Sequence, residues 1–143
     1  MHTQITSTQG FEARYEDDVL VLKLHESTSH AIKGFFETID AYRSLMTHRG
    51  NFYTLLNFSD SDMVLSGPVH DCLQRLIQTS GGRTGTGHFG IVVERSQAET
   101  LEESLKDQVR TSNRVRIFTS YGAALGWLCA LAAAQRFTQA SYA

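Results

Sequence analysis

The segment Asn51-Phe-Tyr-Thr-Leu-Leu-Asn-Phe58 decides the fold, together with the polar loop Ser59-Asp-Ser-Asp62 and the helix start Ser66-Gly-Pro68 that follow it. Both faces of residues 51–58 are mostly apolar, which predicts a strand in the middle of a sheet. Apolar residues then recur at helical spacing at Val69, Cys72, Leu73, Leu76 and Ile77. In α/β proteins, a polar loop between a strand and a helix is a frequent functional site, because hydroxyls, carboxylates and backbone N–H groups meet there.

Regular patterns on either side of this segment predict four more strands and three more helices. The strands are expected at residues 11–15, 19–24, 89–93 and 115–118. The first of them alternates apolar and polar residues, which predicts an edge strand with one solvent-exposed face. The helices are expected between Ser27-Thr-Ser29 and Gly50, from Ser96 with Glu99 as a reciprocal cap, and from Thr119 or Ser120 onward. The order β-β-α-β-α-β-α-β-α predicts an α/β fold with a mixed, mostly parallel five-stranded sheet and four helices.

A single domain accounts for a chain of 143 residues, which is long enough to bury one sizeable core. Residues 1–10 are polar and show no periodicity, so we expect a loose N-terminal lead-in there. The domain is expected over residues 11–136. Residues 137–143 are expected to form a frayed C-terminal tail.

Net charge and hydropathy disfavour two kinds of partner. The net charge is -2, which leaves no basic excess to neutralise the phosphates of a nucleic acid. The longest apolar run, near residues 123–134, is shorter than the ~20 residues that span a bilayer, and no N-terminal signal pattern is present, so we expect a cytoplasmic protein. Cys72 and Cys129 lie in apolar helical patterns and are interpreted as small core residues rather than as a disulfide.

The glycine-rich stretch Gly85-Thr-Gly-His-Phe-Gly90 has the spacing of a dinucleotide-binding loop. In such a loop the glycines follow a strand and open a helix, whereas here they follow a predicted helix and lead into a strand. We therefore expect a flexible connection and no cofactor. The role of residues 81–90 is left open.

Other chemistry-bearing residues form no complete catalytic or metal-binding motif. Ser66 and His70 are four residues apart, but Asp71 projects about 100° away from His70 around the helix and cannot easily orient its imidazole. His25, Glu26 and His30 lack a third ligand at the spacing of a metal site. The sequence thus predicts a protein that is not an enzyme.

The polar loop has two interpretations. It is either an ordinary solvated loop or a regulated contact, in which a phosphate added near Ser66 would alter a docking surface beside Asp60 and Asp62 by its charge. The candidate contact residues are Ser59, Asp60, Ser61, Asp62, Ser66 and Gly67. A phosphate on one of these serines remains a hypothesis.

The order of elements, the polar loop before a capped helix, and the closing run Arg114-Val-Arg-Ile-Phe-Thr-Ser-Tyr-Gly-Ala-Ala-Leu-Gly-Trp-Leu128 resemble the STAS-like superfamily, and within it the SpoIIAA-like group of small bacterial proteins. Anti-sigma factor antagonists of this superfamily carry an Asp-Ser-Ser/Thr-Gly run in which the first Ser is phosphorylated by a partner kinase. The matching stretch here is Val64-Leu-Ser-Gly67, and Leu65 stands where the phosphoacceptor would be.

This resemblance implies a non-enzymatic regulatory domain that docks a protein partner, such as a kinase-like regulator, through residues 59–70. The related CRAL-TRIO-like branch suggests an alternative, a carrier or sensor of a lipid or another small apolar ligand. Its lining would come from Phe35, Phe36, Phe52, Tyr53 and Trp127. A homodimer is compatible with either function, because edge strands and apolar helix faces need cover.

Overall fold

The computed structural model describes residues 2–8, 10–26, 28–46, 50–59, 67–79, 85–111 and 114–142. Within these residues the chain forms six strands and five helices. In chain order they are β1 (His2–Thr8), β2 (Phe11–Glu16), β3 (Val19–Leu24), α1 (Ser29–Met46), β4 (Gly50–Asn57), α2 (Gly67–Thr79), β5 (Gly85–Val92), α3 (Arg95–Ser104), α4 (Lys106–Thr111), β6 (Val115–Phe118) and α5 (Tyr121–Tyr142).

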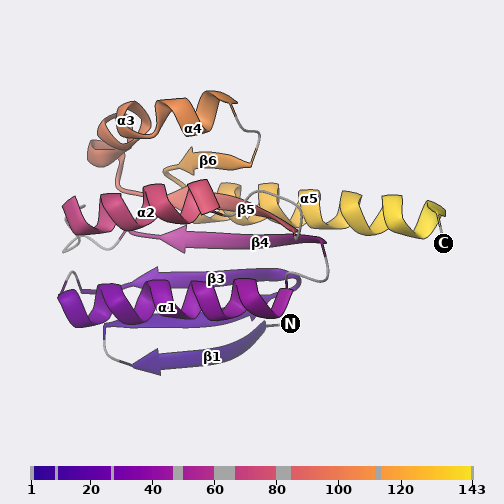
Figure 1. The fold of residues 1–143 in the computed structure, drawn as a ribbon, viewed down its shortest axis with the longest axis horizontal. Coiled ribbons are helices and arrows are strands. Elements are labelled where there is room, and N and C mark those ends of the chain that lie inside the picture. The colour runs from indigo at the N-terminus through magenta and orange to yellow at the C-terminus, as the bar shows by residue number, and fades with distance from the viewer. Residues whose placement is uncertain are drawn as a thin grey trace.

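The six strands form one sheet in sequence order, from β1 to β6. β1, β2 and β3 pair antiparallel, while β3 to β6 pair parallel. The predicted α/β class and the mixed, mostly parallel sheet are therefore confirmed. Each parallel strand lies next to its predecessor, so the right-handed crossovers α1, α2 and α3–α4 all lie on one face, as Figure 1 shows, and α5 lies behind the sheet.

We call the face covered by α1 to α4 the front face and the face covered by α5 the back face. Alternate residues of each strand enter two separate apolar cores. In β3, Leu20 and Leu22 join the front core, whereas Val19 and Val21 join the back core. The same division in β4 explains why both of its faces are apolar, and it confirms that this strand is central.

The front core is organised around Phe35 of α1, whose side chain is fully buried. Its ring lies 5.4 Å from that of Phe58 and 6.2 Å from that of Phe11, between ring centroids. Burying an aromatic side chain of this size contributes about 1.5–3 kcal/mol relative to exposure. These contacts hold α1 against β2 and β4.

The N-terminal residues depart from the prediction. Residues 2–8, expected as part of a loose lead-in, form β1, which pairs with β2 from His2 and Glu16 to Thr8 and Phe11. β2 is consequently not an edge strand. Residues 2–8 contain three threonines and an isoleucine, which favour strands, but they lack the apolar alternation by which the other strands were predicted.

The C-terminal residues also depart from the prediction. α5 continues to Tyr142, so residues 137–142 are helical rather than a frayed tail. No glycine or proline follows Gly126, and the segment is rich in alanine, which favours continuation of a helix. Figure 1 shows that α5 runs past the ends of the strands.

The helix predicted from Ser96 is divided into α3 and α4 at Leu105. Ser96 is not its N-cap. Glu94 occupies the cap position without a side-chain cap bond, and its carbonyl accepts from the Gln97 N–H at 2.9 Å. The helix therefore begins two residues before the position that the Ser96–Glu99 pattern predicted, because the N-cap is Glu94 rather than Ser96.

The glycine-rich stretch is part of β5 rather than a flexible connection. β5 begins at Gly85 and pairs with β4 along its whole length. A Cβ at Gly87 would lie 2.7 Å from Cζ of Phe52, and a Cβ at Gly90 would lie 3.2 Å from Cδ1 of Leu128. These two glycines allow close packing of the front core and of α5 rather than flexibility.

Candidate functional site

The register of the parallel strands places their carboxyl ends along one edge of the sheet. Lys23 pairs with Asn57, Asn57 with Val92, and Val92 with Phe118. The residues that follow these strands form what we call the carboxyl rim: His25, Glu26, Ser59, Glu94, Arg95, Thr119 and Ser120. His25 and Ser59 are half-buried, and the other five residues are exposed. The rim is therefore a polar surface built from four separate connections.

Helices α1, α2, α3 and α5 all begin at this rim (Figure 1). Thr28 Oγ1 accepts a hydrogen bond from the Ala31 N–H at 3.2 Å, and Ser120 Oγ accepts from the Ala123 N–H at 3.3 Å. Both residues are among the predicted N-caps. Helix N-termini carry partial positive charge, which Glu26 and Glu94 oppose, so the rim presents both signs of charge.

Asn57 and Ser59 fix the chain where it leaves β4. Asn57 is buried, and its Oδ1 accepts hydrogen bonds from the Ser59 N–H at 3.0 Å and from Ser59 Oγ at 2.6 Å. Such an Asx turn lets a polar side chain replace a backbone partner at the end of a strand. Ser59 therefore lies at the rim in a defined orientation.

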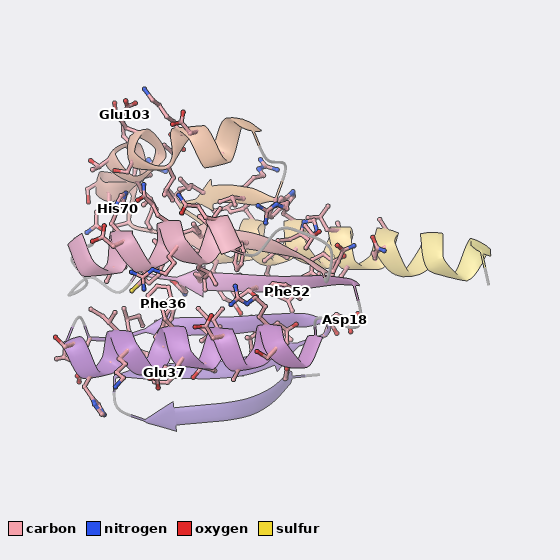
Figure 2. All side chains as sticks on the ribbon, in the orientation of Figure 1. Asp18, Phe36, Glu37, Phe52, His70 and Glu103 are labelled. Carbon is pink, nitrogen blue, oxygen red and sulfur yellow. The ribbon has the colours of Figure 1, made fainter. Side chains whose placement is uncertain are left out.

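The other predicted contact residues are only partly described. Gly67 is the first residue of α2, whereas Asp60, Ser61, Asp62 and Ser66 lie outside the described residues. Two residues after Gly67, the side chain of Val69 is buried and anchors the first turn of α2. Figure 2 shows His70 on the side of α2 that faces α3.

Acidic and basic side chains near the rim meet in pairs. His25 Nε2 lies 3.5 Å from Glu12 Oε2, and His70 Nδ1 lies 3.8 Å from Asp71 Oδ1. The second distance is too long for a hydrogen bond. Within the described part of the chain, no three His, Cys, Asp or Glu side chains are grouped so that they could hold a metal ion. What the rim offers chemically is hydrogen bonding and charge.

The five aromatic residues proposed to line an apolar cavity do not surround one space. Phe35, Phe36 and Phe52 belong to the front face, whereas Tyr53 and Trp127 belong to the back face. Phe35 and Phe52 are at most 1% exposed and fill the front core. Trp127 packs on Phe118, with Arg116 placed 5.5 Å from its ring centroid.

A groove between α1 and α2 was missed from the sequence. It has a volume of about 180 Å³ and is lined by Phe36, Asp40, Arg43, Cys72, Arg75 and Leu76. Phe36 is the one member of the aromatic set that lines it, and Figure 2 shows this side chain between the two helices. Cys72, predicted as a small core residue, is half-buried at the groove and forms no disulfide. The helical stripes of α1 and α2 predicted both helices but not how they face each other.

A polar bridge on the back face was also missed. Arg14 donates to Glu16 at 2.9 Å and to Tyr121 Oη at 2.8 Å, and Tyr121 Oη donates to Glu16 at 2.8 Å. Burial and the Glu16 bond raise the pKa of Tyr121. Burial lowers the pKa of Arg14, but its bonds to Glu16 and Tyr121 outweigh that effect and the net pKa is raised. Arg14 therefore stays charged and Tyr121 stays neutral. The three hydrogen bonds tie the start of α5 to β2.

Among the helices in the described residues, none combines the length and the hydrophobicity needed to cross a membrane. In comparisons with known proteins, no family model, curated protein or solved structure matches the chain.

Proposed function

We propose that this chain is a non-enzymatic regulatory domain that docks a protein partner through the carboxyl rim and the adjoining residues 59–70. One observation carries the proposal: the sheet register brings polar residues from four connections onto a single edge, and they are exposed in three of these connections and half-buried at Ser59. A surface with exposed groups of both charges suits recognition of a protein surface by complementary charges.

The hydrogen bonds at the rim and the sequence resemblance both support docking. Ser59 donates two hydrogen bonds to Asn57 Oδ1. The N–H groups of His25 and Glu26 both donate to Gly10 O, at 2.6 and 3.1 Å. These bonds hold the rim in place before a partner arrives. Preorganisation of this kind lowers the entropic cost of association. The resemblance to anti-sigma factor antagonists suggests a kinase-like regulator in the cytoplasm as the partner.

Charge reversal at the rim tests this proposal. The tagged chain is used to recover proteins from an extract of its source cell, beside the variant Glu26→Lys/Glu94→Lys and the control Asp18→Lys. Asp18 is exposed in the β2–β3 turn, at the opposite edge of the sheet, as Figure 2 shows. We expect one protein to be recovered by the wild type and by the control, and to be reduced at least tenfold with the rim variant.

Two outcomes would contradict the proposal. One is undiminished recovery of the same protein by a rim variant whose circular dichroism matches that of the wild type. The other is recovery of the chain alone together with turnover of a metabolite.

A further inference from the structure

The groove between α1 and α2 lies along the bodies of the two helices rather than at the carboxyl rim. Its residues come from the middle and second half of each helix: Phe36, Asp40 and Arg43 from α1, and Cys72, Arg75 and Leu76 from α2. Any ligand bound there would leave the proposed docking surface open. Binding at the groove can therefore be tested separately from docking at the rim.

The floor of the groove is apolar and rigid. Leu76 is 4% exposed and belongs to the front core. Phe36 is half-buried and packs edge-on against the buried Phe35, with 5.1 Å between ring centroids and 72° between ring planes. Packing against the core limits rotation of both side chains, so the floor is formed before any ligand arrives.

The volume sets the size of the ligand. An engineered cavity of roughly 150 Å³ holds a benzene molecule, so a groove of about 180 Å³ accommodates one aromatic ring with a small substituent. Sites for larger ligands usually measure ~300–1,000 Å³. A long lipid chain would exceed this space.

The charged residues of the groove determine which sign of charge a ligand should carry. Arg43 and Arg75 supply two guanidinium groups, whereas Asp40 supplies one carboxylate, which lies 3.4 Å from Arg43 Nη2. Among the residues that line the groove, positive charges therefore outnumber negative ones. A guanidinium group pairs with carboxylates through two parallel N–H donors and also stacks on aromatic rings, so both parts of an aromatic acid would find a partner.

We propose that this groove is a binding site for a small aromatic carboxylate. The ring lies on Phe36 and Leu76, and the carboxylate is held by Arg43 and Arg75. A cation of the same shape would meet two like charges, and a neutral ligand of the same shape would form no ion pair with them.

An isosteric series tests the site directly. Benzoate, benzamide and benzamidine share a ring and a planar substituent but carry negative, zero and positive charge. Titrated into the 15N-labelled chain, benzoate should bind at least fivefold more tightly than benzamide, and benzamidine most weakly, with the largest shifts at Phe36, Cys72 and Leu76. Equal affinity across the series, or shifts centred elsewhere, would overturn the proposal.

Substitutions of the charged residues that line the groove distinguish a loss of binding from a loss of structure. Arg43→Gln and Arg75→Gln should each weaken benzoate binding at least fivefold. Asp40→Asn should strengthen it several-fold, because it removes the opposing negative charge beside Arg43. Arg116→Gln, a matched loss of an exposed arginine on the back face, should leave the affinity unchanged. Weaker binding by Asp40→Asn, or an equal loss with Arg116→Gln, would contradict the assigned roles.

Cys72 provides a second readout within the groove. Benzoate at saturation should slow alkylation of Cys72 by N-ethylmaleimide at least threefold, measured by mass spectrometry of peptides. Cys129, half-buried against the back core, is the internal control and should react at an unchanged rate. Undiminished alkylation of Cys72 would place the bound benzoate outside the groove and overturn the proposal.

Discussion

Tyr121, the first residue of α5, accepts a hydrogen bond of 2.8 Å from Arg14 on β2, across 107 residues of sequence. The same hydroxyl donates to Glu16, so a single phenol bridges both members of an ion pair. α5 reaches β2 through this bridge, on a part of the back face where β2 contributes charged side chains. It is the polar complement to the apolar contacts that α5 makes with the central strands.

Removal of this hydroxyl should loosen the start of α5. We expect Tyr121→Phe to lower the free energy of unfolding by about 1 kcal/mol, because Arg14 and Glu16 each lose a hydrogen bond while the ring remains. Denaturant unfolding of Tyr121→Phe, Glu16→Gln and the double variant would measure the coupling. Strictly additive effects of the two substitutions would contradict a shared bridge.

Replacement of two glycines by alanine should change the stability of the fold in opposite directions. At Gly87 a Cβ would lie 2.7 Å from Phe52 and 2.9 Å from Phe89, both buried, so we expect Gly87→Ala to destabilise the fold by about 1–3 kcal/mol. At Gly126 in α5 a Cβ meets nothing within 4 Å, so Gly126→Ala should stabilise by about 0.5–1 kcal/mol. Thermal unfolding of both variants measures whether each is less or more stable than the wild type. Equal effects would show that β5 and α5 do not pack as described.

Thr54 is fully buried in β4, and its Oγ1 has no hydrogen-bond partner among the described residues. Replacing that hydroxyl by a methyl group of similar shape removes a desolvated polar atom, so Thr54→Val should raise the free energy of unfolding by about 1 kcal/mol. The matched control is Thr38→Val in α1, which loses a hydrogen bond of 2.9 Å to Gly34 O and should not gain stability. A loss of stability with Thr54→Val would indicate that the hydroxyl has a partner.

His88 should make stability depend on pH. Burial, and then the nearby charge of Arg114, lower its pKa from the ordinary value of 6.5, and its ring stacks on Tyr53 at 5.0 Å. The unfolded chain therefore takes up the proton first, so the contribution of His88 is complete above about pH 6.5 and is lost as the pH falls toward the folded-state pKa.

His88→Phe keeps the stacking and removes the titration. We expect the variant to lose less stability than the wild type between pH 7 and pH 5, as measured by urea unfolding. Identical pH profiles for His88→Phe and the wild type would rule out the assigned effect.

The parts of the fold that were predicted correctly are those that local pattern determines. Residues 19–24 form an almost continuous apolar run, and residues 51–58 are apolar on both faces, so their strands were visible without tertiary information. β1 was missed because polar residues 2–8 become a strand only by pairing with β2. Gly85 to His88 were missed because a glycine that serves close packing looks, in sequence, like a glycine that serves flexibility.

The candidate sites, like the fold, could be predicted only where the local sequence pattern determines them. The loop at residues 59–62 was predicted from its polarity, and the structure places Ser59 at the rim. The groove could not be predicted, because Arg43 and Arg75 lie on different helices and only the packing of α1 beside α2 brings them together. The Arg14–Tyr121 bridge depends likewise on how α5 crosses the back face.

Site-specific photo-cross-linking tests the central claim most directly. A benzophenone amino acid is placed at Thr119 on the carboxyl rim or at Asp18 on the opposite edge, and each variant is irradiated in extract of the source cell. The account predicts one adduct of defined mass that forms from position 119 and not from position 18. An adduct that forms equally from both positions, or only from position 18, would contradict a docking surface at the rim.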